Sequence, residues 1–186
     1  MQEEIETCIE IINKGGIILY PTDTIWGIGC DANNEEAVKK VYDLKQRPDH
    51  KALICLVADV RMLEQNIYEV PEAAYDIIEF ATKPTTIIYD KPTRVAKNLV
   101  GNDDTLAIRV AQDEFCQKLI RKLKRPLVST SANISGEPSP QSFSEISDKI
   151  LKDVDYVVNL HRDKKSGKPS VIIKLSNDGL VKVIRK

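Results

Sequence analysis

Two basic residues, two positions apart, stand where a predicted helix meets a proline. They are Lys45 and Arg47, in the run Lys45-Gln46-Arg47-Pro48. A residue before proline is pushed toward extended geometry, and residues two apart in an extended chain project to the same side. A lysine ammonium and an arginine fork together suit a phosphate or a carboxylate. The alternative is that these cations only complement the dipole at the helix end.

A hydroxyl-rich segment, LVSTSANISG, offers neutral groups that could line the same kind of site. Its first two residues are apolar and predict a buried strand, which runs directly into three hydroxyl side chains. Alternation along an extended chain sends successive side chains to opposite sides. We expect Ser129, Ser131 and Asn133 to face a ligand cavity, and Thr130 and Ala132 to face the packed interior. A polar connection between a strand and a helix is the alternative.

Two further segments could contribute to binding. Arg109 interrupts the apolar run TLAIRV, so its side chain must either face solvent or pair with an anion. The segment PTDTIWGIG follows a buried strand, as many ligand-binding loops do. It lacks the third glycine of a dinucleotide fingerprint. We interpret its tryptophan, Trp26, as a packing residue.

Length and composition predict one globular domain, spanning residues 1–186, without an overall electrostatic bias. With 42% hydrophobic residues, 30% charged residues and a net charge of -1, the chain has no global preference for nucleic acid or membranes. The N-terminus is acidic and amphipathic, unlike a signal peptide, and no apolar run approaches the ~20 residues that would cross a bilayer. We therefore expect a cytoplasmic protein without membrane contact.

The cysteines and histidines form no recognisable metal-binding or catalytic pattern. The 4 cysteines are scattered without a C-x-x-C pair, so we interpret them as reduced thiols, most of them in the core. His50 and His161 stand alone. We expect no protein-bound zinc, no organic cofactor and no Ser-His-Asp triad, and the sequence contains neither a Walker A loop nor an H-E-x-x-H motif.

Apolar runs predict strands that alternate with helices. Strands are expected at 17–20, 52–57, 85–89, 105–110, 126–131, 155–160, 170–175 and 180–185. Helices are expected from about residue 5 to 12 and near 59–65, 71–81, 113–124 and 142–152. Another helix is expected to begin at a capping box of Asn33 with Glu36, and a second capping box, Ser142 with Glu145, opens the helix at 142–152. This alternation favours a sheet covered on both faces, and the SNDG hairpin between the last two strands makes it mixed. The basic segment 161–169 is expected to be a mobile loop.

The order of these signals resembles the YrdC family of threonylcarbamoyl-AMP synthases. The matching blocks are YPTDTIWGIG, KQRP, LAIRV, STSANISG and KPSVI, followed by a strand that ends in Arg185. The resemblance implies an α/β fold (α+β in some schemes), with a twisted mixed parallel and antiparallel sheet, helices on both faces and a concave cationic cavity. It also implies that L-threonine, bicarbonate and ATP react to give threonylcarbamoyl-AMP and pyrophosphate. Downstream threonylcarbamoyl-transferase proteins would use this product to modify tRNA.

The resemblance further implies a role for each site residue, carried over by position. The proposed catalytic residues are Lys45 and Arg47, both on the ATP phosphates. The other residues implied to bind ATP are Thr105, Ser129, Asn133 and Arg185. The residues implied to hold L-threonine are Thr22, Arg109, Ser131 and Ser170, with Arg109 facing the carboxylate. Mg²⁺ would accompany ATP, and no residue is expected to bind a metal directly.

Several positions depart from the family pattern. Ala52 replaces a common proline, and Lys83 lies where a Pro-Gly-Pro-x-Thr run has its glycine. Leu56 and Gln141 stand where some relatives have histidine and threonine. Two alternatives to the synthase remain. One is a module that binds double-stranded RNA or tRNA, although 5% aromatic residues and a net charge near zero argue against it. The other is a paralogue that has lost threonine activation.

Overall fold

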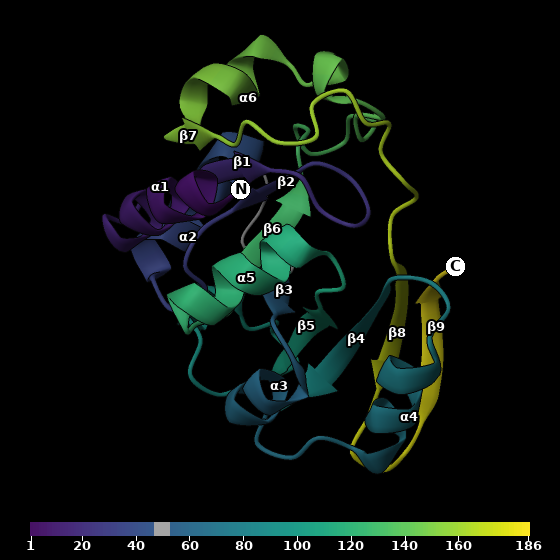
Figure 1. Cartoon of the computed structure of the whole chain (residues 1–186). Coiled ribbons are helices and arrows are strands. Elements are labelled where there is room, and N and C mark those ends of the chain that lie inside the picture. Colours follow the sequence, from purple (N-terminus) through teal and green to yellow (C-terminus); the bar gives the residue numbers. More distant parts are fainter. Residues whose placement is uncertain (47–52) are drawn as a thin grey trace.

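The computed structural model describes residues 1–46 and 53–186 (Figure 1). Arg47 and His50 lie outside the described residues, as does Ala52. The expected arrangement of Arg47 beside Lys45 therefore stays a prediction.

Within the described ranges, the strands form one nine-stranded sheet in the order β7-β1-β2-β6-β3-β5-β4-β8-β9. The strands are β1 (Ile18–Tyr20), β2 (Gly27–Gly29), β3 (Ile54–Val57), β4 (Thr85–Asp90), β5 (Thr105–Val110), β6 (Leu127–Ser131), β7 (Tyr156–Val157), β8 (Val171–Leu175) and β9 (Val181–Arg185). The α-helices are α1 (Gln2–Asn13), α2 (Glu35–Lys45), α3 (Val60–Asn66), α4 (Glu72–Phe80), α5 (Glu114–Leu123) and α6 (Asp148–Asp153). Two short 3₁₀ helices are η1 (Lys97–Leu99) and η2 (Phe143–Glu145).

The sheet is mixed, as predicted. Parallel pairs join β1 to β7, β3 to β5 and β4 to β8, and the other neighbours run antiparallel. The SNDG turn connects β8 and β9 as an antiparallel hairpin. The expected α/β fold with a mixed sheet is therefore confirmed.

Strand alternation divides the apolar side chains between two cores, one on each face of the sheet. On β6, Val128 belongs to the core that α2 and α4 cover, whereas Leu127 belongs to the core that α1 and α5 cover. On β3, Cys55 and Leu56 divide in the same way. Figure 1 shows α1 and α5 side by side over the part of the sheet near β1, β6 and β3. Helices thus lie on both faces, as expected.

The helix starts differ in detail from the predictions. Asn34, not Asn33, caps α2, because its side-chain oxygen accepts a hydrogen bond from the Ala37 N–H at 3.0 Å. The capping box predicted at Ser142 is also wrong, since that hydroxyl instead bonds the hydroxyl of Ser144 at 2.9 Å. The predicted helix 142–152 is divided into η2 and α6.

The strand β2 was not expected, because Gly-Ile-Gly carries no strand pattern of its own. It pairs antiparallel with β1 and β6 and brings Gly27 opposite Ser131. A Cβ atom at Gly29 would stand only 2.3 Å from the carbonyl oxygen of Val128, so this close approach requires glycine. β2 thereby places the TDTIW loop beside the hydroxyl-rich end of β6.

The remaining expectations concern thiols, the basic loop and membranes. All four cysteines are free and buried, as interpreted from the sequence. Residues 161–169 form an irregular connection, tied down by the N–H groups of Ser166 and Gly167, which bond the carbonyl oxygens of Gln141 (2.8 Å) and Thr24 (2.6 Å). In the part of the chain that the structure describes, no helix has the length and apolar character to cross a membrane.

Candidate active site

A cavity of about 270 Å³ opens on the sheet face that α1 and α5 cover only in part. Alternation explains its floor: Leu106 and Ile108 on β5 point into the opposite core, whereas Ala107 and Arg109 line the cavity. The lining side chains come from the loop after β1 and from β2, β3, β4, β5, β6, β8 and β9. The cavity is lined by Thr22, Thr24, Ile25, Trp26, Gly27, Leu53, Ile54, Ile88, Ala107, Arg109, Ser129, Thr130, Ser131, Ser139, Pro169, Ser170, Ile172, Ile184 and Arg185.

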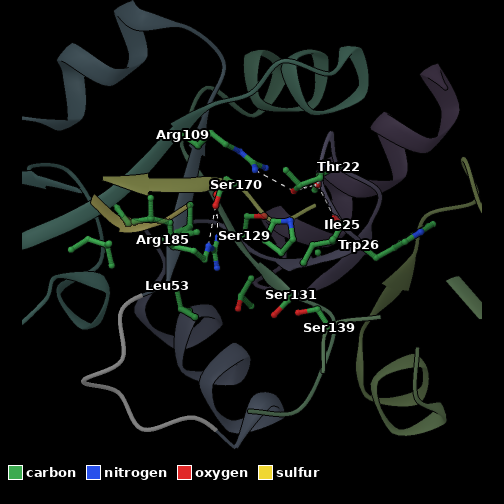
Figure 2. A pocket seen from close by; sticks show the side chains of 18 of the residues that line it. Thr22, Ile25, Trp26, Leu53, Arg109, Ser129, Ser131, Ser139, Ser170 and Arg185 are labelled. Atoms are coloured by element: carbon green, nitrogen blue, oxygen red, sulfur yellow. Dashed lines mark hydrogen bonds between the residues drawn. The ribbon is translucent and has the colours of Figure 1, made fainter. Parts of the chain in front are cut away.

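Most of the predicted site residues that the structure describes meet in this cavity. Those that line it are Thr22, Arg109, Ser129, Ser131, Ser170 and Arg185. Figure 2 shows Ser170 and Arg185 on one side of the cavity and Thr22 with Trp26 on the other. Segments far apart in the sequence therefore converge as predicted.

Arg109 is the most deeply buried cation that faces the cavity. Only 5% of it is exposed, so the first alternative from the sequence, a solvent-facing side chain, is wrong. Its Nη2 atom pairs with Oδ1 of Asp23 at 2.9 Å, and its Nη1 donates to the Thr24 hydroxyl at 3.2 Å. Its Nε is buried without a hydrogen-bond partner among the described residues. A buried donor of this kind fits a bound anion.

The TDT sequence after β1 forms a tight polar loop. The Thr22 hydroxyl donates to the carbonyl oxygen of Ile25 at 2.7 Å, and it accepts a hydrogen bond from the Thr24 N–H at 3.0 Å. The two threonine hydroxyls lie 2.9 Å apart. These bonds fix the loop from which Thr24 and Asp23 hold Arg109.

The carboxyl of Asp23 is in an unusual electrostatic setting. Burial raises its pKa above the ordinary value, the nearby charge of Arg109 opposes this, and Asp113 adds to the rise. The loss of hydration therefore outweighs the attraction of the arginine. Asp23 and Asp113 face a second cavity, of about 490 Å³, which shares the wall Thr22, Thr24, Ile25 and Trp26 with the first.

Arg185 approaches the cavity from the edge strand β9. Its Nε donates to the carbonyl oxygen of Ser170 at 3.0 Å and its Nη2 donates to the hydroxyl of Ser170 at 3.3 Å. That hydroxyl lies 2.8 Å from the hydroxyl of Thr86. Burial, and then the positive charge of Arg109, lower the pKa of Arg185. Both guanidinium groups line one cavity, so an anion bound there would offset their like charges.

Lys45, at the end of α2, lies behind the hydroxyl-rich wall and not among the residues that line the cavity. It is 1% exposed. Its ammonium donates to the carbonyl oxygens of Ser131 and Asn133, both at 2.6 Å, and to Oδ1 of Asn133 at 3.3 Å. The ammonium therefore contacts backbone oxygens at the end of β6.

The predicted alternation along residues 129–133 holds only in part. Ser129 and Ser131 line the cavity and Ala132 is buried, as expected. Asn133 does not line it, because β6 ends at Ser131 and the chain turns, with the Asn133 N–H bonded to the carbonyl oxygen of Ser131 at 2.9 Å. Thr130, predicted to face the interior, contributes to the lining.

Thr105 also lies away from the lining residues. It shares its face of β5 with Arg109 but precedes it by four residues, which is ~13 Å along a strand. Its hydroxyl donates to Oδ1 of Asp103 at 2.7 Å. The expected contact of Thr105 with ATP stays a prediction.

Sequence reasoning missed two kinds of residue in the site. Asp23, Thr24 and Thr86 each bind a predicted site residue, and the repeated pattern Thr-Asp-Thr after a strand was the available signal for the first two. The apolar part of the lining was not anticipated either, although alternation around the predicted polar positions could have found it. Outside the loop after β1, it includes Leu53, Ile54, Ile88, Ala107, Pro169, Ile172 and Ile184.

The described residues contain no group of three or more His, Cys, Asp or Glu side chains that could hold a metal ion. His161 lies on the irregular loop and lines the second cavity. The polar groups that line the first cavity include those of its two arginines and its hydroxyl-bearing side chains.

Fold and cavity together describe a mixed α/β domain with a concave, positively charged pocket. Residues 10–186 match the model of the Sua5_yciO_yrdC family, described as "Telomere recombination". The chain belongs to this family, as the resemblance indicated.

Individual relatives agree with this placement. A Methanocaldococcus jannaschii protein, provisionally named threonylcarbamoyl-AMP synthase, is 38% identical over an alignment of 191 positions, which covers 98% of this chain and 87% of the relative. The threonylcarbamoyl-AMP synthase of Idiomarina loihiensis is 34% identical over 167 residues, 88% of this chain and 90% of its own.

Among solved structures, that of Pyrococcus abyssi Sua5 complexed with L-threonine matches with a TM-score of 0.83 and 30% identity over 94% of this chain. The present chain spans about half of that protein, 52%. The structure of Escherichia coli YciO matches with a TM-score of 0.86 and 28% identity, covering 100% of this chain and 90% of YciO.

Proposed function

We propose that this protein is an L-threonylcarbamoyladenylate synthase, a nucleotidyltransferase that makes threonylcarbamoyl-AMP and pyrophosphate from L-threonine, bicarbonate and ATP. The observation that carries the proposal is the convergence of two guanidinium groups, those of Arg109 and Arg185, on one pocket with a hydroxyl-bearing wall. All three substrates bring negative charge into such a pocket. The family and its synthase-named relatives support the same reaction.

L-threonine is assigned to the side of the pocket formed by Arg109 and the TDT loop. The buried Arg109 would bind the carboxylate, which its arginine fork suits. Thr22, Ser131 and Ser170 would orient the amino acid through their hydroxyls. Asp23 and Thr24 already hold the guanidinium, so it needs little reorganisation to bind substrate.

ATP is assigned to the side of the pocket formed by β8 and β9. Arg185 and Ser129 would bind polar parts of the nucleotide, and the floor of Ile54, Ile88 and Ile172 offers an apolar surface for a base. Arg47 is proposed to bind the phosphates, together with Lys45 from behind the hydroxyl-rich wall. Thr105 and Asn133 would act from behind the lining, since neither borders the cavity. Mg²⁺ would arrive with the phosphates of ATP as part of the substrate.

The chemistry requires positioning more than a protein nucleophile. The threonine amine and bicarbonate give an N-carboxylated threonine with loss of one water molecule. One of its carbamate oxygens then attacks the α-phosphorus of ATP, and the bond to the leaving pyrophosphate breaks. The residues of this chain would hold the two reactants in line and stabilise the developing negative charge.

The direct test is incubation with ATP, Mg²⁺, bicarbonate and L-threonine, followed by measurement of pyrophosphate. We expect pyrophosphate release that depends on threonine and on bicarbonate, together with threonylcarbamoyl-AMP detected by mass spectrometry. Arg121→Met, a change of an exposed arginine on α5, is the matched control for changes in the pocket. Absence of threonine-dependent pyrophosphate would contradict the proposal.

The two alternatives give different results. A paralogue without threonine activation would bind ATP and release no pyrophosphate. An RNA-binding module would retain tRNA on a filter at moderate salt, whether or not the small substrates are present. In the proposed role the product passes to threonylcarbamoyl-transferase proteins that modify tRNA, and we place this activity in the cytoplasm.

A further inference from the structure

Beside Ser170, on the neighbouring strand β4, lies a threonine whose hydroxyl is sealed from solvent. Thr86 is 0% exposed, and its side chain shares a face of β4 with Ile88, which lines the cavity, whereas Ile87 points into the opposite core. The parallel pairing of β4 with β8 brings Thr86 close to Ser170, and the two hydroxyl oxygens lie 2.8 Å apart. Thr86 is not among the lining residues, so it can reach a ligand only through Ser170.

The hydroxyl of Ser170 contacts Thr86 on one side and Arg185 on another. A guanidinium can only donate, so Ser170 must accept the hydrogen bond from Nη2 of Arg185, which lies 3.3 Å away. Nε of Arg185 also donates to the carbonyl oxygen of Ser170 at 3.0 Å, and these two bonds hold the guanidinium against Ser170 (Figure 2). A serine hydroxyl has two lone pairs and one hydrogen. One lone pair is thus occupied, and the contact with Thr86 uses either the second lone pair or the hydrogen.

Burial decides the direction of the bond between the two hydroxyls. Among the residues that the structure describes, Ser170 provides the hydrogen-bond partner of the Thr86 hydroxyl. If Ser170 donated this bond, the hydrogen of Thr86 would be buried at 0% exposure without an acceptor, which is costly. If Thr86 donates, its hydrogen is satisfied and both lone pairs of Ser170 are filled. The hydrogen of Ser170 is then left for the cavity that this residue lines.

We propose that Thr86 is a positioning residue, whose hydroxyl donates to Ser170 and so directs the hydroxyl hydrogen of Ser170 into the cavity. This inference rests on the proposed function, because Ser170 is assigned there to L-threonine. A carboxylate only accepts hydrogen bonds, so a serine held as a donor suits the carboxylate of the amino acid. Thr86 acts on the substrate through Ser170 and not by contact.

The experiment is calorimetric titration of L-threonine, without nucleotide, into the wild type, Thr86→Val, Thr86→Ser and Thr85→Val. Valine has nearly the shape of threonine but lacks the hydroxyl, whereas serine keeps the hydroxyl and lacks the methyl group. Thr85 is the matched control, because it is the adjacent residue of β4 and its hydroxyl donates elsewhere, to the carbonyl oxygen of Lys83 at 2.9 Å.

We expect Thr86→Val to weaken threonine binding about three- to tenfold, the net contribution of one hydrogen bond, and Thr86→Ser and Thr85→Val to bind as the wild type does. Affinity in Thr86→Val equal to that of the wild type would overturn the inference. An equal loss in Thr86→Ser would also overturn it, because that result would assign the effect to packing of the methyl group. If Thr86→Val does not fold, Thr86→Ala removes the same hydroxyl, and the same results are expected.

A double-mutant cycle with Ser170→Ala separates action through Ser170 from a general effect on the fold. The quantity measured is kcat/KM for threonine in pyrophosphate release, which stays measurable when binding is weak. We expect Ser170→Ala to lower kcat/KM, and Thr86→Val to lower it no further in the Ser170→Ala background. Losses that multiply independently would overturn the inference. A wild type that binds no threonine contradicts the proposed function itself, which is a different result from a wild type that binds and a Thr86→Val variant that binds equally well.

Discussion

Two halves of one face of the sheet have opposite characters. Under α1 and α5, the strands contribute apolar side chains such as Tyr20, Leu56 and Leu127 to a closed core. Beyond these helices, the same face carries Arg109 and Ser131 and encloses a cavity. The strands are continuous across the boundary, so strand pairing alone does not distinguish a core from a pocket. The extent of the helical cover and the side chains at alternate positions do.

The strand β6 contains the whole transition. Leu127 is fully buried against the helices, Ser129 two residues later borders the cavity, and Ser131 two residues further on lies at the end of the strand. Two side chains on the same face of one strand, only two residues apart, therefore have different roles: the first stabilises the fold and the second is proposed to bind substrate.

Arg109→Met tests the polar half with the largest expected effect. We expect threonine-dependent pyrophosphate release to fall by on the order of 10²-fold or more, because a preorganised cation is lost. The substitution also leaves Asp23 without its ion-pair partner, so thermal unfolding should be measured in parallel. A rate close to that of the wild type, in a variant that is folded, would show that Arg109 does not face the substrate.

Leu127→Ala and Ser131→Ala form a matched pair on one strand and one face. Leu127→Ala should lower the free energy of unfolding by about 2–5 kcal/mol, since it leaves a cavity in the closed core. Its activity per folded molecule should change little. Ser131→Ala should change stability by less than about 1 kcal/mol and reduce kcat/KM for threonine about tenfold. Denaturant unfolding measures the stability of each variant, and steady-state kinetics measures its activity. A large loss of stability in Ser131→Ala, with a large loss of activity in Leu127→Ala, would contradict the division of this sheet face into a core and a pocket.

Gly29→Ala and Gly27→Ala sharpen the boundary at β2. The added Cβ at Gly29 would meet the carbonyl oxygen of Val128 at 2.3 Å, and we expect a loss of about 1–3 kcal/mol in the free energy of unfolding. At Gly27 the nearest atom is the Ser129 hydroxyl oxygen, at 3.2 Å. Gly27→Ala should be nearly as stable as the wild type and should bind substrate more weakly, because the added methyl group enters the cavity wall. Equal stability of the two variants in urea would argue against the close packing of β2 on β6.

The smallest effect on stability is expected at the ion pair of Lys174 with Asp103, neither of which lines the cavity. The hydrogen bond from Lys174 lowers the pKa of Asp103, so the stabilisation is present above the ordinary pKa of 3.8 and is lost as the pH falls through the lowered value. Lys174→Met should therefore cost less than about 1 kcal/mol at neutral pH and nothing in strong acid. Stability curves of both proteins against pH measure this, and a deficit that grows toward acid would contradict the sign.

The sequence predicted the parts of the fold that carry a strong repeating pattern. The apolar run TLAIRV matches β5 residue for residue. The SNDG turn connects β8 and β9 as the predicted hairpin. β2 escaped prediction because three residues with two glycines have neither a period nor a strand preference, and only pairing on both sides makes them a strand. The cap of α2 was predicted one residue too early, at Asn33, because neighbouring asparagines are equally good caps.

In the site, the residues involved were easier to predict than the directions in which their side chains point. Arg109 was recognised as unusual in an apolar strand, but its partner Asp23 could not be found, since the two are joined only by the tertiary fold. Alternation predicted Ser129 and Ser131 correctly and failed at Asn133, because the strand ends at Ser131 and no local signal marks where extended geometry stops. Lys45 was assigned to the phosphates from the family resemblance, and that role stays a prediction. Its hydrogen bond to the carbonyl oxygen of Ser131, 86 residues further along the chain, could not be found from the sequence.

The order of strands in the sheet bears on how the protein is made. The cavity draws its walls from segments that range from the loop before β2 to Arg185 on β9, so no early portion of the chain can assemble it alone. During synthesis β1 would leave the ribosome long before its partner β7, and β4 long before its partner β8. Such non-local pairings form slowly, and a substrate that binds only the assembled pocket stabilises only the finished chain. Threonine and ATP are therefore expected to protect the completed protein against unfolding and to give no help to the growing one.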